Sequence, residues 1–108
     1  MKKVTLTCAH AIVKYLIAQK ILIDGKKEPL FPGVFGIFGH GNVACLGQAL
    51  EENQKDLPTY RGHHEQNMAL TGIGYARAKR RQQIFVATSS VGPGATNMVT
   101  AAAVAMSN

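Results

Sequence analysis

Two adjacent histidines and a glutamate are the residues of this sequence whose types could do chemistry together. They are His63, His64 and Glu65, within the stretch Gly-His-His-Glu-Gln-Asn-Met-Ala (62–69). A zinc site on a helix places its ligands on one face, typically at i and i+4, whereas adjacent residues point about 100° apart. The spacing therefore predicts no metal site. It favours a carboxylate in the first turn of a helix, where the helix dipole stabilises it by about 0.3 to 1 kcal/mol.

Two glycine-rich turns follow apolar runs and could also form part of a site. The first, Gly-His-Gly-Asn (39–42), follows 34–38, and the second, Gly-Pro-Gly-Ala-Thr-Asn (92–97), comes shortly after 84–87. Backbone N–H groups at the start of a helix can bind an anion, although neither turn has GxGxxG or P-loop spacing. Either turn alone could serve only to reverse the chain. Together they would lie at the carboxyl edge of a parallel sheet, where open α/β folds bind ligands.

The elements that position these residues alternate between helices and short strands. Thr7 is a suitable N-cap for the first helix, and residues 24–33 read as an exposed loop. Alternation of this kind predicts βαβ units, a parallel sheet with flanking helices and right-handed crossovers, which is an α/β fold. The helices are expected at about 8–20, 43–53, 64–79 and 95–106, and the strands at 34–38, 57–60 and 84–87.

The composition is that of one globular domain. The chain has 108 residues, 46% of them hydrophobic, and a net charge of +6. The basic residues are scattered and lack interleaved aromatic side chains, so no nucleic-acid partner is expected. No apolar run approaches the roughly 18 residues of a membrane span. Three strands make a thin core, so residues 1–108 are expected to be a fragment that ends where a fourth strand should begin.

The two cysteines, Cys8 and Cys45, lie in separate apolar segments without metal-ligand spacing. We expect them to be buried, reduced thiols of a cytoplasmic protein. The helix at 64–79 is rich in alanine and glycine, which leaves one side nearly smooth so that another backbone can approach closely.

The order of these motifs is more specific than any one of them, and it resembles the pyrimidine-binding N-terminal domain of thiamine-diphosphate enzymes of the acetohydroxyacid synthase and pyruvate decarboxylase group. Within that superfamily, the pattern is most similar to the ring-opening hydrolases of inositol catabolism. His64 stands where asparagine is expected, and Phe38 where decarboxylases often have proline. The segments that carry the resemblance are VFGIFGHGN, ALEE, LPTYRGHHEQNMALTGIGYARAKRR and IFVATSSVGPGATNMVTAAAVA.

The resemblance implies a cofactor, thiamine diphosphate with Mg²⁺, and a catalytic role for Glu65. That carboxyl would hydrogen-bond the aminopyrimidine ring and promote loss of the thiazolium C2 proton, and burial in a dry interface would raise its pKa. His40 and His64 would contact a small-molecule substrate. The residues that would contact the cofactor are Glu65, Phe38, Gly39, Asn42, Gly92, Pro93 and Asn97.

The resemblance also implies that the rest of the site lies outside this chain. Diphosphate and metal would be held by a later domain with a GDG segment, usually from the partner subunit of a homodimer or tetramer, and this chain contains no such segment. The fragment alone is therefore expected to be inactive, with its Ala/Gly helix left exposed. Three alternatives are another thiamine-diphosphate lyase or transferase, a small α/β module that binds an anion, and a basic RNA-associated protein.

Overall fold

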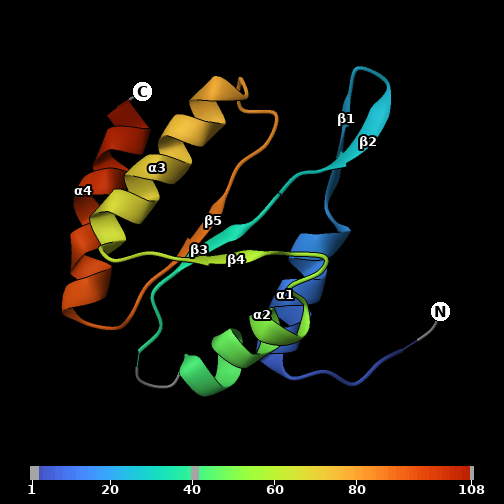
Figure 1. Ribbon diagram of the computed structural model, residues 1–108, viewed down its shortest axis with the longest axis horizontal. Coiled ribbons are helices and arrows are strands. Elements are labelled where there is room, and N and C mark those ends of the chain that lie inside the picture. The colour runs from blue at the N-terminus through green and yellow to red at the C-terminus, as the bar shows by residue number, and fades with distance from the viewer. Residues whose placement is uncertain (1–2, 40–41, 108) are drawn as a thin grey trace.

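The fold is built on a three-stranded parallel sheet, as Figure 1 shows for a computed structural model that describes residues 3–39 and 42–107. The strand order is β4 (Thr59–Arg61), β3 (Val34–Gly36), β5 (Val86–Thr88), so the first of the three along the chain lies in the centre. Val34 is in register with both Thr59 and Val86. The predicted α/β fold with a parallel sheet is confirmed. The strands are shorter than predicted, and β4 and β5 begin two residues later.

Helices flank the sheet in two groups (Figure 1). On one side α1 packs against the π-helical turn η1 and the short helix α2 that continues it, and on the other α3 packs against α4 and against β3 and β5. The predicted helices are thus all present, with boundaries shifted by a few residues. Their bounds are α1 (Cys8–Ala18), η1 (Val43–Gly47), α2 (Gln48–Glu52), α3 (Glu65–Ala78) and α4 (Pro93–Ser107).

Successive residues of β3 serve the two faces of the sheet, because side chains alternate along a strand. Val34 is buried in the apolar core with Val13 of α1 and Leu50 of α2. Phe35 joins an aromatic cluster instead, with its ring centroid 4.6 Å from that of Phe85. The ring of Phe85 in turn lies 4.7 Å from Tyr75 of α3. The central strand is therefore covered by apolar contacts on both faces, which fixes where its carboxyl end points.

The first helix starts as the sequence indicates. The Thr7 side chain accepts a hydrogen bond from the backbone N–H of His10, which makes Thr7 the N-cap of α1. The His10 imidazole contacts the Thr7 hydroxyl through Nδ1, and through Nε2 it bonds the Glu52 carboxylate of α2 at 2.5 Å. This ion pair joins α1 to α2 on the outside of the core.

The segment predicted as an exposed loop contains an antiparallel hairpin, so that prediction was wrong. Strand β1 (Lys20–Ile23) pairs with β2 (Lys26–Pro29) across the turn Asp24-Gly25. Both turn residues have positive φ, 52° and 82°. Tight hairpin turns require positive φ at both central residues, and they favour Asp-Gly because both residues adopt that conformation at little energetic cost. The hairpin is tied to the main body by Gln83, whose side chain donates to the Pro29 carbonyl at 2.8 Å.

Both cysteines are exposed, which corrects the expectation that they are buried. Cys8 is the first residue of α1, on a turn whose outer side faces solvent, and Cys45 lies within η1, where no residue is buried. Apolar residues next to a cysteine in the sequence do not decide which face of the helix the cysteine lies on, and both cysteines lie on the outer face.

The small residues of α3 do allow a close approach, but within this chain it is made by β5 and α4. A cavity of about 340 Å³ runs between α3, α4 and β5. Gly72 faces Phe85 across it, because a Cβ atom added at Gly72 would lie 3.7 Å from Phe85 Cβ. Gly74 faces open space. The expectation that the small residues of α3 are exposed is therefore correct for Gly74, which faces open space, and wrong for Gly72, which packs against β5.

Candidate functional site

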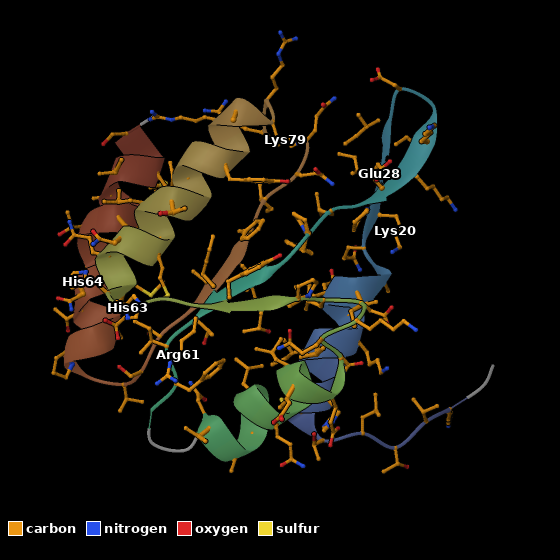
Figure 2. All side chains as sticks on the ribbon, in the orientation of Figure 1. Lys20, Glu28, Arg61, His63, His64 and Lys79 are labelled. Atoms are coloured by element: carbon orange, nitrogen blue, oxygen red, sulfur yellow. The ribbon has the colours of Figure 1, made fainter. Side chains whose placement is uncertain are left out.

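Glu65 is buried at the start of α3. It is the first residue of the helix, follows the extended N-cap residue His64, and retains 7% exposure. The chain arrives there from β4 through Arg61, Gly62 and His63. Gly62 lets this approach run tightly over the helix, because a Cβ atom at that position would overlap the Met68 side chain. The helix start thus places one carboxylate in a protected position. His63 and His64, the two residues before it, lie at this end of α3 (Figure 2).

The carboxylate is held by residues of the turn between β5 and α4. The Ser90 hydroxyl donates a hydrogen bond to Glu65 Oε2 at 3.0 Å. Gly94, the second residue of α4, is buried against the same two groups, since a Cβ atom there would overlap both Ser90 Oγ and Glu65 Oε2. Only glycine therefore lets the start of α4 come this close to the carboxylate.

The hydrogen bonds lower the pKa of Glu65 below its usual value. Its own backbone N–H contributes most, followed by the Ser90 hydroxyl, while burial acts in the opposite direction. The Asn97 side chain and the nearby His64 imidazole make smaller contributions that also lower the pKa. The sequence analysis expected a raised pKa for a carboxyl buried in a dry interface, because burial disfavours the ionised form. That interface is not part of this chain, so the expectation stays a prediction; within the chain, the donors to the carboxylate outweigh its burial.

The two glycine turns lie side by side, as predicted. A Cβ atom added at Gly39 would lie 2.8 Å from Ser90 Cβ, so the turn after β3 packs directly on the turn after β5. The Asn42 side chain donates to the Ser89 carbonyl at 3.4 Å, which adds a long hydrogen bond between the same turns. Gly39, Asn42, Ser90 and Glu65 therefore belong to one cluster at the carboxyl edge of the sheet.

The second turn brings three predicted residues to this cluster. Gly92 has a positive φ of 67°, and Pro93 begins α4. The Gly92 carbonyl accepts from the Thr96 backbone N–H at 3.0 Å, which closes the first turn of the helix. Asn97, one turn further on, interacts with the Glu65 carboxylate. All three lie on the segment that packs against Glu65.

Three predicted residues lie apart from the cluster or outside the described residues. The Phe38 ring turns toward α2, packs on the apolar core, and would lie 2.8 Å from a Cβ atom at Gly36. It supports the turn rather than facing Glu65. His40 falls outside the described residues. His64 is exposed, and its side chain makes no capping hydrogen bond to α3.

Sequence reasoning missed Ser90 and Gly94 as members of the site. Gly94 stands within the turn 92–97 as the second glycine of Gly-Pro-Gly, and Ser90 stands two residues before that motif; these were the available signals. Neither signal predicted that Ser90 and Gly94 would contact Glu65, because Glu65 is 25 residues away from Ser90 along the chain. Only the packing of α3 on α4 brings the three together.

Two further observations concern the described part of the chain. Within residues 3–39 and 42–107, no group of three His, Cys, Asp or Glu side chains is arranged so that it could hold a metal ion. Over the same residues, no helix has the length and apolar character required to cross a bilayer.

Residues 7–108 match the family described as the thiamine pyrophosphate enzyme, N-terminal TPP binding domain. The match covers nearly the whole chain. The chain belongs to this family. Thiamine pyrophosphate is another name for thiamine diphosphate, so the resemblance inferred from the motifs is confirmed at the level of the family.

Relatives within the family extend the comparison to named enzymes. The chain is 54% identical over its full length to a 3D-(3,5/4)-trihydroxycyclohexane-1,2-dione hydrolase of Geobacillus thermodenitrificans. It is 50% identical over its full length to proteins of the same name in Clostridium tetani and Bacillus thuringiensis. In each case the chain spans 17% of the length of the relative.

Proposed function

We propose that this chain is the pyrimidine-binding part of a thiamine-diphosphate-dependent hydrolase, in which Glu65 is the catalytic carboxylate. The observation that carries the proposal is a buried carboxylate at the carboxyl edge of the sheet, with one oxygen bonded by Ser90 and glycines packed around it. The family match supplies the cofactor class. Because an ordinary helix cap is solvated, the burial and cross-turn bond of Glu65 favour a role beyond capping.

The residues present fit the aminopyrimidine half of that cofactor. A carboxyl group has about four lone-pair sites, and the donors to Glu65 (its backbone N–H, Ser90 and Asn97) leave room for it to share one proton with a ring nitrogen, which is an acceptor when unprotonated. Glycines at 39 and 94 let the two turns close around Ser90 and Glu65, because a Cβ atom at either position would crowd those side chains. When bound, thiamine diphosphate supplies the carbanion chemistry needed to break a carbon–carbon bond.

The role of Glu65 is to hold and share a proton with the ring nitrogen that it contacts. Within this chain the pKa of Glu65 is lowered, so the free carboxylate is ionised at neutral pH, and the shared proton would be taken up from solvent when the ring binds and excludes water. The turn 92–97 and Gly39 shape the same pocket, and Asn42 ties the first turn to the second. We propose that His40 and His64 contact the substrate, and that Phe38 supports the first turn from the side of the apolar core.

The relatives' names point to the substrate class. We infer that the full-length protein opens the ring of 3D-(3,5/4)-trihydroxycyclohexane-1,2-dione by hydrolysis. The bond between the two carbonyl carbons breaks, water adds, one carbonyl carbon becomes a carboxylate and the other an aldehyde, which gives 5-deoxy-glucuronate. This reaction would serve the catabolism of myo-inositol in the cytoplasm.

The remaining parts of the holoenzyme lie in sequence beyond this chain. We propose that a later domain holds the diphosphate through Mg²⁺, that two or four subunits assemble so that this domain faces Glu65 from a partner, and that residues 1–108 alone have no activity. The relatives are about six times as long as this chain, which leaves ample length for such domains.

Calorimetric titration of the full-length protein with thiamine diphosphate tests the cofactor assignment. With Mg²⁺ present we expect saturable binding of one cofactor per chain, and with the cyclic dione added we expect release of an acid that titrates as a carboxylic acid. Absence of binding would overturn the cofactor assignment. Binding without hydrolysis of the dione, but with condensation of pyruvate, would replace the hydrolase with a synthase.

A further inference from the structure

The bond between Ser90 and Glu65 joins two elements that meet only in the folded molecule. Ser90 lies in the turn after β5, and Glu65 begins α3, 25 residues earlier. The bond runs from the Ser90 hydroxyl to Oε2, which gives one of the two carboxylate oxygens a fixed donor at 3.0 Å. A side chain with three rotatable bonds is thereby held in one orientation at its reactive end.

The position of the Ser90 hydroxyl is itself fixed by backbone on two sides. Gly39 packs against Ser90 so closely that a Cβ atom added to Gly39 would lie only 2.8 Å from Ser90 Cβ. Gly94 packs against Ser90 Oγ and Glu65 together. A serine between two such close backbone contacts has little freedom to choose another partner, so the donor is preorganised for Glu65.

Ser90 also changes what the carboxylate can do. A hydroxyl donor favours the ionised form, and the Ser90 bond is the second largest of the contributions that lower the pKa of Glu65. The titratable side chain that acts on Glu65 from the described residues is His64, whose contribution is smaller. The Ser90 bond occupies part of the acceptor capacity of Oε2 and fixes the direction of that oxygen.

We propose that Ser90 is the positioning residue of Glu65, bonding Oε2 so that the carboxyl group is held in one orientation toward the ring nitrogen of the cofactor. This inference rests on the proposed function, because it assumes that Glu65 is the residue that contacts the cofactor. Ser90 itself touches neither cofactor nor substrate in this arrangement. Gly94 completes it, since any larger residue would displace the hydrogen bond.

The test uses the full-length protein and four variants: Ser90→Ala, Glu65→Gln, the double variant, and Ser107→Ala as a matched control. Ser107 also donates one hydrogen bond, to the Ala103 carbonyl at 2.9 Å, but at the far end of α4. Both serine variants therefore lose one hydroxyl and one hydrogen bond of similar length. Only Ser90→Ala removes a donor from Glu65.

The first measurement is the melting temperature of the cofactor-free proteins at pH 7 and near pH 4. The folded-state pKa of Glu65 is lowered, so its ionised-state stabilisation is present at pH 7 and is lost as the pH falls through that pKa. We expect Ser90→Ala to lower the melting temperature more at pH 7 than near pH 4, and to have little effect in the Glu65→Gln background. A decrease equal at both pH values and in both backgrounds would show that Ser90 only packs, and would overturn the proposal.

The second measurement is steady-state turnover with saturating cofactor. We expect Ser90→Ala to lower kcat on the order of 10-fold, as for loss of one hydrogen bond to a charged group, with KM for the dione little changed. Ser107→Ala should match the wild type. An unchanged kcat for Ser90→Ala, with Glu65→Gln inactive, would overturn the positioning role alone. Full turnover by Glu65→Gln would instead overturn the proposed function.

Discussion

Glu65 has the contacts of an ordinary first-turn carboxylate together with contacts that such a residue lacks. It lies in the first turn of α3, where its own backbone N–H bonds the carboxylate and the helix dipole favours a negative charge. It is also buried and bonded by Ser90 from another element, which an ordinary cap is not. The helix start therefore fixes the carboxylate, and the turn before α4 aims it.

Gly94→Ala should disrupt this arrangement with the smallest change available. The added methyl group would overlap Ser90 Oγ and Glu65 Oε2, so one of them must move. Because misplacement of a reacting group by about 1 Å can cost on the order of 100-fold, we expect turnover of the full-length protein to fall by at least 10-fold. Steady-state kinetics measure the loss.

The same substitution at Gly74 is the control for that experiment. Gly74 lies in the interior of α3, and a Cβ atom there has no atom within 4 Å. Alanine favours a helix by about 0.8 to 1 kcal/mol over glycine, so Gly74→Ala should raise the melting temperature and leave turnover unchanged. If both alanine variants change turnover by the same factor, the close contact at Gly94 is not the cause of the loss of turnover.

The turn of the β1–β2 hairpin depends on two residues with positive φ. Gly25 has a φ of 82°, where a side chain is strained whatever space surrounds it. We expect Gly25→Ala to destabilise the protein by about 1 kcal/mol. Asp24→Asn should be nearly neutral, because asparagine tolerates the left-handed region as aspartate does. Denaturant unfolding followed by circular dichroism distinguishes them; an equal loss for both would contradict this explanation.

The ion pair between α1 and α2 should make the protein sensitive to acid. The His10 side chain, followed by Gln48, lowers the pKa of Glu52 below 4.5, so the stabilisation is present above that value and is lost as the pH falls through the lower folded-state pKa. We expect Glu52→Gln to lower the melting temperature at pH 7 and to have progressively less effect below pH 4. In the His10→Ala background the effect at pH 7 should shrink. A pH-independent effect would contradict the role of the charge.

Local patterns predicted the helices and strands, because each depends on residues that are neighbours in sequence. The pairing of the two glycine turns followed from the alternation of these elements, because parallel strands end at the same edge of the sheet. The hairpin was locally encoded as well, by Asp24-Gly25 between β-branched and charged residues, but its charge and prolines suggested a loop. The lowered pKa of Glu65 and the role of Ser90 depend on how α3 packs against α4. No local pattern carries that information.

The molecule as described supplies one side of a site. The cluster around Glu65 lies at one end of the sheet, with His63 and His64 near it, and Glu28 and Lys20 of the hairpin lie far from it (Figure 2). If a later domain holds the diphosphate and Mg²⁺, binding should link the two domains. The chain would then be stabilised only when both parts of the cofactor are held.

Removal of the metal tests this linkage. At a free cofactor concentration of about 100 Kd, binding to the native state adds about 2.7 kcal/mol of stability. We expect thiamine diphosphate with Mg²⁺ to raise the melting temperature of the full-length protein, and a chelator to reverse the rise. Equal stabilisation by thiamine diphosphate in the presence of the chelator would contradict a metal-held diphosphate.

The most direct test of Glu65 as the catalytic carboxylate is the turnover of Glu65→Gln in the full-length protein. The amide keeps the size of the side chain but cannot take up and return a proton. Glu28→Gln, on the hairpin, is the matched control. We expect Glu65→Gln to retain a wild-type fold by circular dichroism while kcat falls on the order of 100-fold or more, with Glu28→Gln unaffected. Turnover of Glu65→Gln within about 2-fold of the wild type, a difference of less than 0.5 kcal/mol in barrier, would contradict the assignment.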